Sequence, residues 1–148
     1  MNIILSVITV LVTFGSMEFV AWFTHKFIMH GFLWILHKDH HKPDHDKLEK
    51  NDLFALIFAL PSTALLISGS ISRISFEFWI GLGIALYGLA YFLFHDVLIH
   101  ERVKVFRGDK NKYFRAIITA HNDHHVGKKN YGFLFMVPWR YFRQEFFK

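Results

Sequence analysis

Three long runs of apolar residues divide the chain. They lie at about 2–24, 53–72 and 74–94, and each carries at most one charged side chain. Each run is close to the ~20 residues that an α-helix needs to cross a bilayer. Buried helices of soluble proteins give similar runs, but three of them in 148 residues favour a membrane protein. The pattern therefore predicts an all-α, integral membrane fold with about three spanning helices.

The positive charges lie mainly in the polar segments between and after these runs. Residues 25–52 hold five Lys or Arg and residues 99–148 hold eleven, whereas the connection between the second and third runs holds only Arg73. Because cytoplasmic segments of membrane proteins are enriched in Lys and Arg, we expect both polar segments and the C-terminus in the cytoplasm. The second and third runs then form a hairpin that either crosses the bilayer or re-enters it. The net charge of +5 marks this orientation and favours anionic lipid, so it needs no nucleic acid.

Composition narrows the chemistry further. The chain is 53% hydrophobic and has no cysteine, which excludes disulfides, iron–sulfur clusters, zinc–thiolate sites and cysteine nucleophiles. Any metal must therefore be held by His, Asp or Glu. The length suits one domain, residues 1–148, and we interpret the apolar start as a retained anchor, since no cleavage pattern follows it.

Ten of the eleven histidines fall into four motifs. The order along the chain is HxxxxH, HxxHH, HxxxxH, HxxHH, a twice-repeated two-part unit that spans residues 25–41 and 95–125. Only His45 lies outside it. Two motifs sit at the ends of spans and two in the polar segments, so the sidedness predicts one histidine-rich metal cap on the cytoplasmic side. The predicted metal ligands are His25, His30, His37, His40, His41, His95, His100, His121, His124 and His125.

The spacing of the motifs favours metal binding. Helix positions i, i+3 and i+4 share a face, so the three histidines of each HxxHH are expected to converge. The two histidines of HxxxxH are about 140° apart on a straight helix. They can meet only if the helix bends, ends or changes pitch between them; otherwise each serves a different metal. Ten imidazoles exceed the capacity of one ion, which favours two ions. Imidazole suits zinc, copper, iron and nickel alike.

Acidic residues near the motifs are candidates for supporting the ligands. Glu18 lies in the first apolar run, where a carboxyl group is costly and therefore a functional candidate. It either supports the site by hydrogen bonding or pairs with a polar group on another span. Asp39, Asp96 and Asp123 lie within or beside the motifs, where each either orients an imidazole or sits in solvent.

Three aromatic residues are candidates for a substrate path. Trp22 lies between Glu18 and the first motif, and Tyr87 and Tyr91 precede the third motif on the last span. The alternative for each is ordinary packing or anchoring at the membrane interface.

These motifs and the words around them carry a family resemblance. The histidine pattern resembles the fatty acid hydroxylase and sterol desaturase superfamily of membrane di-iron enzymes. Residues 17–31 (MEFVAWFTHKFIMHG), 49–53 (EKNDL), 87–96 (YGLAYFLFHD) and 132–134 (GFL) are similar to the bacterial β-carotene hydroxylases within it. The resemblance covers most of the chain, although Val97 and residues 101–105 depart from the family's words.

The resemblance implies an activity. Such enzymes hydroxylate the β-ionone ring at carbon 3 and convert β-carotene to zeaxanthin through β-cryptoxanthin. They use two iron ions, with O2 as cosubstrate and electrons from an external donor, ferredoxin and its reductase. Because imidazole also suits zinc, zinc can occupy such a site in purified protein. The implied location is the bacterial inner membrane, where the carotenoid stays in the lipid.

Two other functions compete with this one. Another oxygenase of the superfamily, such as a carotenoid ketolase or a sterol or fatty acyl hydroxylase or desaturase, would share the histidine motifs. A non-catalytic membrane metal-binding protein is the second, but a transporter holds its ligands near mid-bilayer, whereas these motifs lie at the ends of spans.

Overall fold

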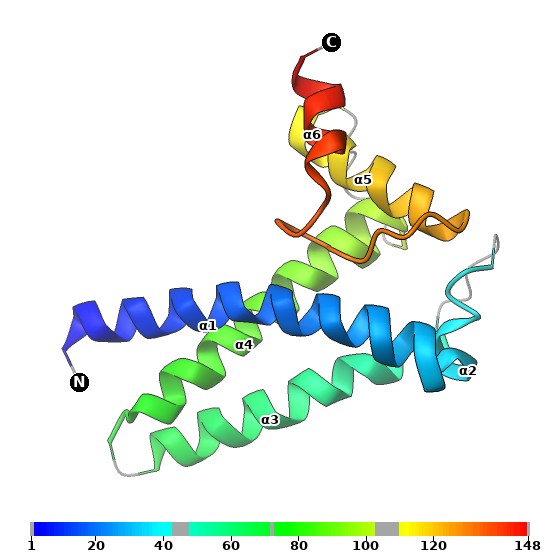
Figure 1. Ribbon diagram of the computed structural model, residues 1–148. Coiled ribbons are helices and arrows are strands. Elements are labelled where there is room, and N and C mark those ends of the chain that lie inside the picture. Colours follow the sequence, from blue (N-terminus) through cyan, green and yellow to red (C-terminus); the bar gives the residue numbers. More distant parts are fainter. Residues whose placement is uncertain (1, 43–47, 72, 103–109, 148) are drawn as a thin grey trace.

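The computed structural model describes residues 2–42, 48–71, 73–102 and 110–147, and every regular element within them is a helix (Figure 1). Three long helices dominate. Helix α1 (Ile3–Phe23) continues into the π-helical segment η1 (Thr24–Phe32), and α4 (Phe76–Tyr91) continues into the π-helical segment η3 (Phe92–Ile99). Between them a 3₁₀ turn, η2 (Lys50–Asp52), leads into α3 (Leu53–Ser70). The shorter helices are α2 (Trp34–His37), α5 (Lys112–His125) and α6 (Trp139–Phe146).

The three long helices are long and apolar enough to cross a membrane. They extend over Ile3–Phe32, Lys50–Ser70 and Phe76–Ile99. Three spanning helices were expected, and this expectation is confirmed, but the first and third helices run beyond positions 24 and 94 because π-helical turns carry them through the HxxxxH motifs. Their outward faces are apolar and exposed, for example at Ile3, Leu11 and Leu60. Lipid, unlike water, covers such faces without cost.

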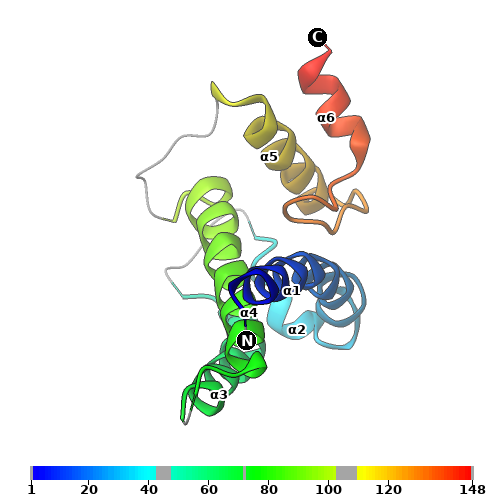
Figure 2. The ribbon, with the colours of Figure 1, turned by 90° about the vertical axis from the view of Figure 1, so that its left-hand side faces the viewer.

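Small residues allow the long helices to pack closely. Helices α3 and α4 form an antiparallel hairpin, and α1 crosses α4 (Figures 1 and 2). At the hairpin the Ser62 hydroxyl donates to the Gly81 carbonyl over 2.8 Å. A Cβ atom at Gly81 would lie 3.0 Å from the Ser62 carbonyl oxygen, and one at Gly83 would lie 3.0 Å from the carbonyl oxygen of Val10. Glycine at both positions therefore sets the helix spacing.

Helices α5 and α6 lie side by side, away from the α3–α4 hairpin (Figure 2). Their core is built by Ala116, Ile117, Ala120, Val137, Tyr141 and Phe142. The α5–α6 loop, residues 126–138, returns to the long helices. Phe133 and Leu134 of this loop are buried against Met17 and Ala21 of α1 and Tyr87 of α4. Non-helical backbone is thereby packed beside a spanning helix.

Candidate metal centre

The π-helical pitch brings the histidines of each HxxxxH motif together. In a π-helix the backbone bonds run from residue i to i+5, so residues five apart lie above one another. In η3 the His100 amide donates to the His95 carbonyl over 3.0 Å, and the two rings have their centroids 4.7 Å apart. The centroids of His25 and His30 in η1 are 5.0 Å apart. Of the alternatives open from the spacing, a change of pitch is therefore the one realised.

The three histidines of each HxxHH motif do not converge on one point, contrary to our expectation. His37 and His41 place their Nε2 atoms 3.2 Å apart, and those of His121 and His125 are 2.8 Å apart. The middle histidine of each motif points elsewhere. Residues four apart lie nearly above one another, but consecutive residues such as 124 and 125 diverge by about 100° on a helix.

The middle histidines are exchanged between two groups of ligand atoms. We call the first group centre A and the second centre B; within each, the potential ligand atoms lie within 4.8 Å of one another. Centre A takes the pair from η1, the outer histidines of the first HxxHH and the middle one of the second. Centre B takes the pair from η3, the middle histidine of the first HxxHH and the first one of the second. The members are His25, His30, His37, His41 and His124 in centre A, and His40, His95, His100 and His121 in centre B.

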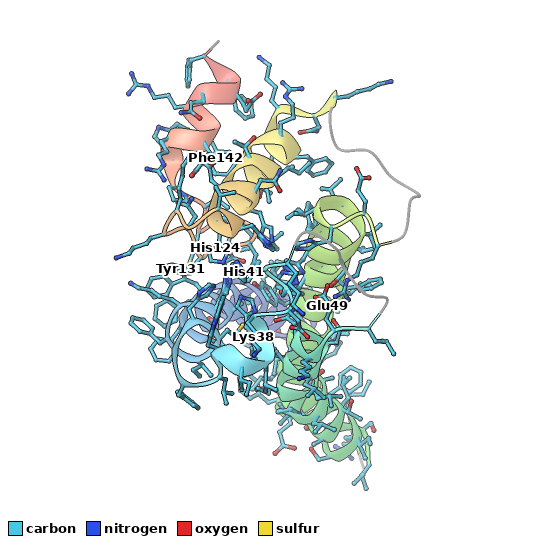
Figure 3. All side chains as sticks on the ribbon, turned by 90° about the vertical axis from the view of Figure 1, so that its right-hand side faces the viewer. Lys38, His41, Glu49, His124, Tyr131 and Phe142 are labelled. Atoms are coloured by element: carbon cyan, nitrogen blue, oxygen red, sulfur yellow. The ribbon has the colours of Figure 1, made fainter. Side chains whose placement is uncertain are left out.

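His125 adjoins centre B, because its Nε2 atom lies 2.8 Å from that of His121. Its ring also stacks on His41 of centre A, with centroids 4.5 Å apart. Figure 3 shows His41 and His124 close together, with the loop residue Tyr131 beside them. With His125 counted in centre B, each centre has five imidazoles in the same order of motif positions. The sequence repeat thus becomes a repeat in space.

Hydrogen bonds at Nδ1 turn the Nε2 atoms toward the centres. The Nδ1 atom of His37 lies 2.6 Å from Asn51 Oδ1, that of His40 lies 2.8 Å from Glu49 Oε2, and that of His25 lies 3.2 Å from the Tyr131 carbonyl oxygen. All three partners accept, so each Nδ1 carries the proton and each Nε2 presents a lone pair. None of these partners was predicted from the sequence, although Glu49 and Asn51 stand in the EKNDL word and Tyr131 directly precedes GFL.

The ligand atoms face one another in a way that calls for a cation. Pairs of Nε2 atoms approach to 2.9 Å between His30 and His124, to 3.1 Å between His40 and His95, and to 3.0 Å between His100 and His121. Two lone pairs at this distance repel unless a proton or a metal ion relieves them. Imidazole nitrogens with fixed tautomers are ligands that suit iron, zinc, copper and nickel. The donor set therefore fits a pair of divalent metal ions.

Burial keeps these imidazoles in their metal-binding form. Burial, together with the neighbouring histidines, lowers the pKa of His37 to about 3 and that of His124 to about 2. Burial likewise lowers the pKa of His41 and holds the pKa of His121 well below its usual value. Because a metal ion competes with protons for the same lone pair, low pKa values leave the ligand atoms available at neutral pH.

Glu18 supports the α5–α6 loop rather than an imidazole directly. Its carboxyl group is 1% exposed, and one oxygen accepts from the backbone amides of Phe133, Leu134 and Met136 over 2.8 to 3.1 Å. The other oxygen accepts from the Tyr87 hydroxyl over 2.8 Å. The alternative in which Glu18 pairs with another span is thus realised at Tyr87. Irregular backbone beside a spanning helix must have its amides satisfied by protein, which explains an acid at this depth.

The loop that Glu18 holds reaches both centres. Phe133 stacks on His25 at 4.9 Å between centroids and lies 5.7 Å from His95. Gly132 has no room for a Cβ atom against the Met136 carbonyl, so only glycine permits this turn. Glu18 therefore positions ligands through the loop. In the sequence this loop was marked only by its GFL word. The hydrogen bonds that join it to Glu18 connect residues more than a hundred positions apart, so they could not be predicted.

The three aspartates of the motifs have other partners. Asp39 accepts from the backbone amides of His40 and Lys50, and Asp123 binds Lys128 and the Tyr141 hydroxyl. Neither accepts from an imidazole within the described ranges. Only Asp96 lies beside one, with its carboxylate 3.6 Å from His95 Nδ1.

Asp96 belongs to a partly buried ionic cluster beside centre B. The Arg102 guanidinium lies 2.7 Å from Glu49, 2.8 Å from Asp52 and 3.2 Å from Asp96. This cluster ties η2 to the end of η3. It joins segments that are about 50 residues apart in the chain, so no local sequence pattern predicts it.

Comparison with known proteins places this arrangement in a family. The fatty acid hydroxylase family model matches residues 10–143. This chain belongs to the fatty acid hydroxylase family. A β-carotene hydroxylase of Pantoea ananas is 40% identical over 87% of this chain and 76% of its own length, and one of Paracoccus sp. strain N81106 is 39% identical over 97% and 90%.

A relative from a plant is also similar. A chloroplastic β-carotene 3-hydroxylase of an Oncidium hybrid cultivar is 43% identical, and the match covers 78% of this chain but 39% of that protein. No solved structure matches. The family and these relatives identify the chain as an oxygenase enzyme. Together with the histidine clusters, they indicate that it binds metal.

A cavity of about 940 Å³ connects this hydroxylase's metal centre to its long helices. It lies between α1, α3 and α4, and its walls are mostly apolar, with Phe58, Ile84 and Phe133 among them. Exposed wall residues such as Ala59 and Phe92 show that it opens between the helices. Its far end is polar and reaches His100, Asp96 and Arg102.

Two of the three aromatic candidates for a substrate path line this cavity, and the third does not. Tyr87 and Tyr91 line it, and Tyr91 also stacks on His95 with centroids 4.6 Å apart. Trp22 is not among its walls: it stacks on Phe19 and lies beneath the Lys26 ammonium. A helix turns by about 100° per residue. Trp22 therefore points about 100° away from its neighbour Ala21, which lines the cavity.

Proposed function

We propose that this protein is a membrane di-iron monooxygenase that hydroxylates the β-ionone ring of carotenoids at carbon 3. The substrate is β-carotene, and the product is zeaxanthin by way of β-cryptoxanthin. The observation that carries the proposal is the apolar cavity that opens among lipid-exposed helices and ends at His100 of centre B. A ring can enter this cavity while its polyene chain stays in the bilayer.

The ten motif histidines are the proposed ligands, five for each of two iron ions. Bound iron supplies the redox chemistry by which O2 is activated. The ligand set fits because the Nε2 lone pairs converge while Asn51, Glu49 and the Tyr131 carbonyl hold the opposite ring nitrogens. The residues 1–148 serve as one membrane hydroxylase domain.

The protein's own residues position the substrate and exclude water. Apolar walls such as Phe58 and Ile84 bind the ring, and Tyr91 and Phe133 pack between the cavity and the imidazoles. Each turnover inserts one oxygen atom of O2 into a carbon–hydrogen bond. The other oxygen atom takes up two electrons and two protons and leaves as water. The polar end at Asp96 and Arg102 is suited to a ring that has gained a hydroxyl group.

A carotenoid is favoured over other apolar substrates by the relatives. Proteins named as β-carotene hydroxylases match over most of this chain. A ketolase, or a sterol or fatty acyl oxygenase of the same superfamily, is the alternative. It would use the same centre and would differ in its product.

The proposed setting is the bacterial inner membrane, with centres A and B on the cytoplasmic side. The basic residues of α5, α6 and their loop, including Lys112, Lys129 and Arg143, then face the cytoplasm. Such a face attracts an acidic electron-transfer protein, for which ferredoxin with its reductase is the proposed donor.

Expression in a bacterium that accumulates β-carotene tests the function. We expect β-cryptoxanthin and zeaxanthin in the extracted pigments, and their loss when the ligand His121 is changed to Ala. Unchanged β-carotene in cells that hold the iron-loaded protein and a reductant would refute the proposal. Keto-carotenoids instead of hydroxylated ones would establish the alternative.

A further inference from the structure

The two metal centres differ in the groups that hold their imidazoles. In centre A the partners are uncharged: the Asn51 side-chain oxygen holds His37, and the Tyr131 carbonyl holds His25. In centre B the partner is a carboxyl group, because Glu49 holds His40 over 2.8 Å, and both side chains are almost fully buried. Within the described residues, no carboxyl group contacts a ring of centre A.

A second carboxyl group reinforces this difference. Asp96 lies 3.6 Å from His95 Nδ1, which is too far for a hydrogen bond, so it acts on this second imidazole of centre B only through its charge. The Arg102 guanidinium contacts Glu49, Asp52 and Asp96. It fixes the orientation of the carboxyl groups and offsets only one of three acids. The surroundings of centre B are therefore richer in negative charge.

A carboxylate that accepts from Nδ1–H makes the opposite nitrogen a stronger donor. It draws the proton toward itself, which raises the electron density at Nε2, whereas an amide or carbonyl oxygen does this more weakly. Loss of such a partner typically lowers metal affinity by about 10- to 100-fold. The low-dielectric, buried setting also strengthens the attraction between a divalent ion and nearby acids.

From these contacts we infer that the two metal positions are inequivalent, and that centre B binds its ion first and more tightly. Glu49 and Asn51 are the positioning residues that set this order. They lie two residues apart on one turn, yet each holds a histidine of a different centre. The inference rests on the proposed metal centre and adds an order of loading to it.

Competition between the purified protein and a chelator for Zn²⁺ tests the inference without reliance on catalysis. We expect two classes of bound ion in the full-length protein, separated by roughly 10- to 100-fold in affinity. His100→Ala should remove the tight class and His30→Ala the weak class. One class of two equal ions would overturn the inference, and so would the opposite assignment.

Conservative changes at the two positioning residues give the sharper measurement. Glu49→Gln keeps an oxygen that can accept from His40 but removes the charge, so the tight class should weaken by about 10- to 100-fold while the weak class stays. Asn51→Asp adds a charge behind His37 and should strengthen the weak class. Equal weakening of both classes by Glu49→Gln would overturn the inference.

A matched control separates the charge effect from a general loss of stability. Glu145 is also a buried acid paired with an arginine, Arg115, over 2.8 Å, but it lies in α6. Glu145→Gln should leave both classes unchanged. If the parent protein binds no Zn²⁺ that His30→Ala or His100→Ala removes, the metal centre itself is refuted, which is a different result from two equal ions.

Discussion

Replacing Glu18 by Gln removes the negative charge of α1 while keeping its size and one oxygen. Four donors converge on the carboxyl group: three backbone amides of the α5–α6 loop and the Tyr87 hydroxyl. An ionised carboxyl group only accepts, so it satisfies all four. In the Glu18→Gln variant the new amide nitrogen is itself a donor. The Tyr87 hydroxyl is the only one of the four groups that can accept a hydrogen bond from this nitrogen, and it must rotate to do so.

The size of the effect follows from these four bonds. Hydrogen bonds to a charged acceptor contribute about 1.5 to 3 kcal/mol each, and neutral ones about 0.5 to 1.5 kcal/mol. Loss of the charge across four bonds therefore costs about 4 kcal/mol. Because each ~1.4 kcal/mol is a factor of ten, the loop should open about a thousandfold more often. The Tyr131 carbonyl then holds His25 less firmly, so metal affinity at centre A should fall as well.

Hydrogen exchange of the protein in detergent measures this opening. The amides of Phe133, Leu134 and Met136 should be protected in the parent protein and exchange far faster in Glu18→Gln. Tyr87→Phe is the control, because it removes one bond and leaves the three amide bonds intact. It should speed exchange of the loop amides far less than Glu18→Gln does, because the carboxylate still accepts from all three of them.

Two results would refute this reasoning. One is parental exchange at the three loop amides in Glu18→Gln. The other is faster exchange over α4 rather than over the loop, which would show that the carboxyl group mainly holds the helices together.

Four further changes test the centre and the cavity. His121→Ala should abolish activity and lower the metal content, whereas His45→Ala, at a position outside the described residues, should keep both; equal activity would contradict the ligand set. Ala59→Trp should block the cavity and raise the apparent KM for the carotenoid without loss of metal, as pigment conversion and metal analysis would show. The pKa values of His37 and His124 in the folded protein lie near 3 and 2, below the ordinary value of 6.5. Below pH 6.5 the unfolded chain therefore binds more protons than the folded protein does. The free energy of unfolding of the metal-free protein should therefore fall by about 1.4 kcal/mol per pH unit for each of these two histidines, from pH 6.5 down to their folded pKa values. A denaturation midpoint that stays constant over this pH range would contradict the prediction.

Much of the fold was predictable because its signals are local. Runs of apolar residues set the three long helices, and the spacing of the histidines marked the motifs. The end of each span was less predictable, since residues 24–32 and 92–99 continue the helices with π-helical pitch. The hydropathy of a segment does not reveal which pitch it adopts. The histidine spacing required a bend, an end or a change of pitch, and the structure decided between them.

The supporting residues were harder to predict because their partners are distant in the chain. Glu18 was singled out by its cost in an apolar helix, but its main partners lie 115 to 118 residues away. Asp39 and Asp123 were singled out because they adjoin histidines, but the structure pairs them with backbone amides, Lys128 and the Tyr141 hydroxyl. Glu49 is nine residues from His40 in the chain, and no helical spacing predicts that the two side chains meet.

The sequence by itself determined that this protein has three long apolar helices, a basic side and ten histidines in a repeated pattern. These properties belong to composition and short spacing, which survive without any knowledge of the fold. Only the tertiary structure decided which histidines share a centre. His124 and His125 point to different centres because consecutive helical residues diverge, and His40 and His41 do the same in the turn that follows α2. Each HxxHH motif therefore serves both centres. The same packing brings an acid behind one centre and an amide behind the other, which no spacing in the chain specifies.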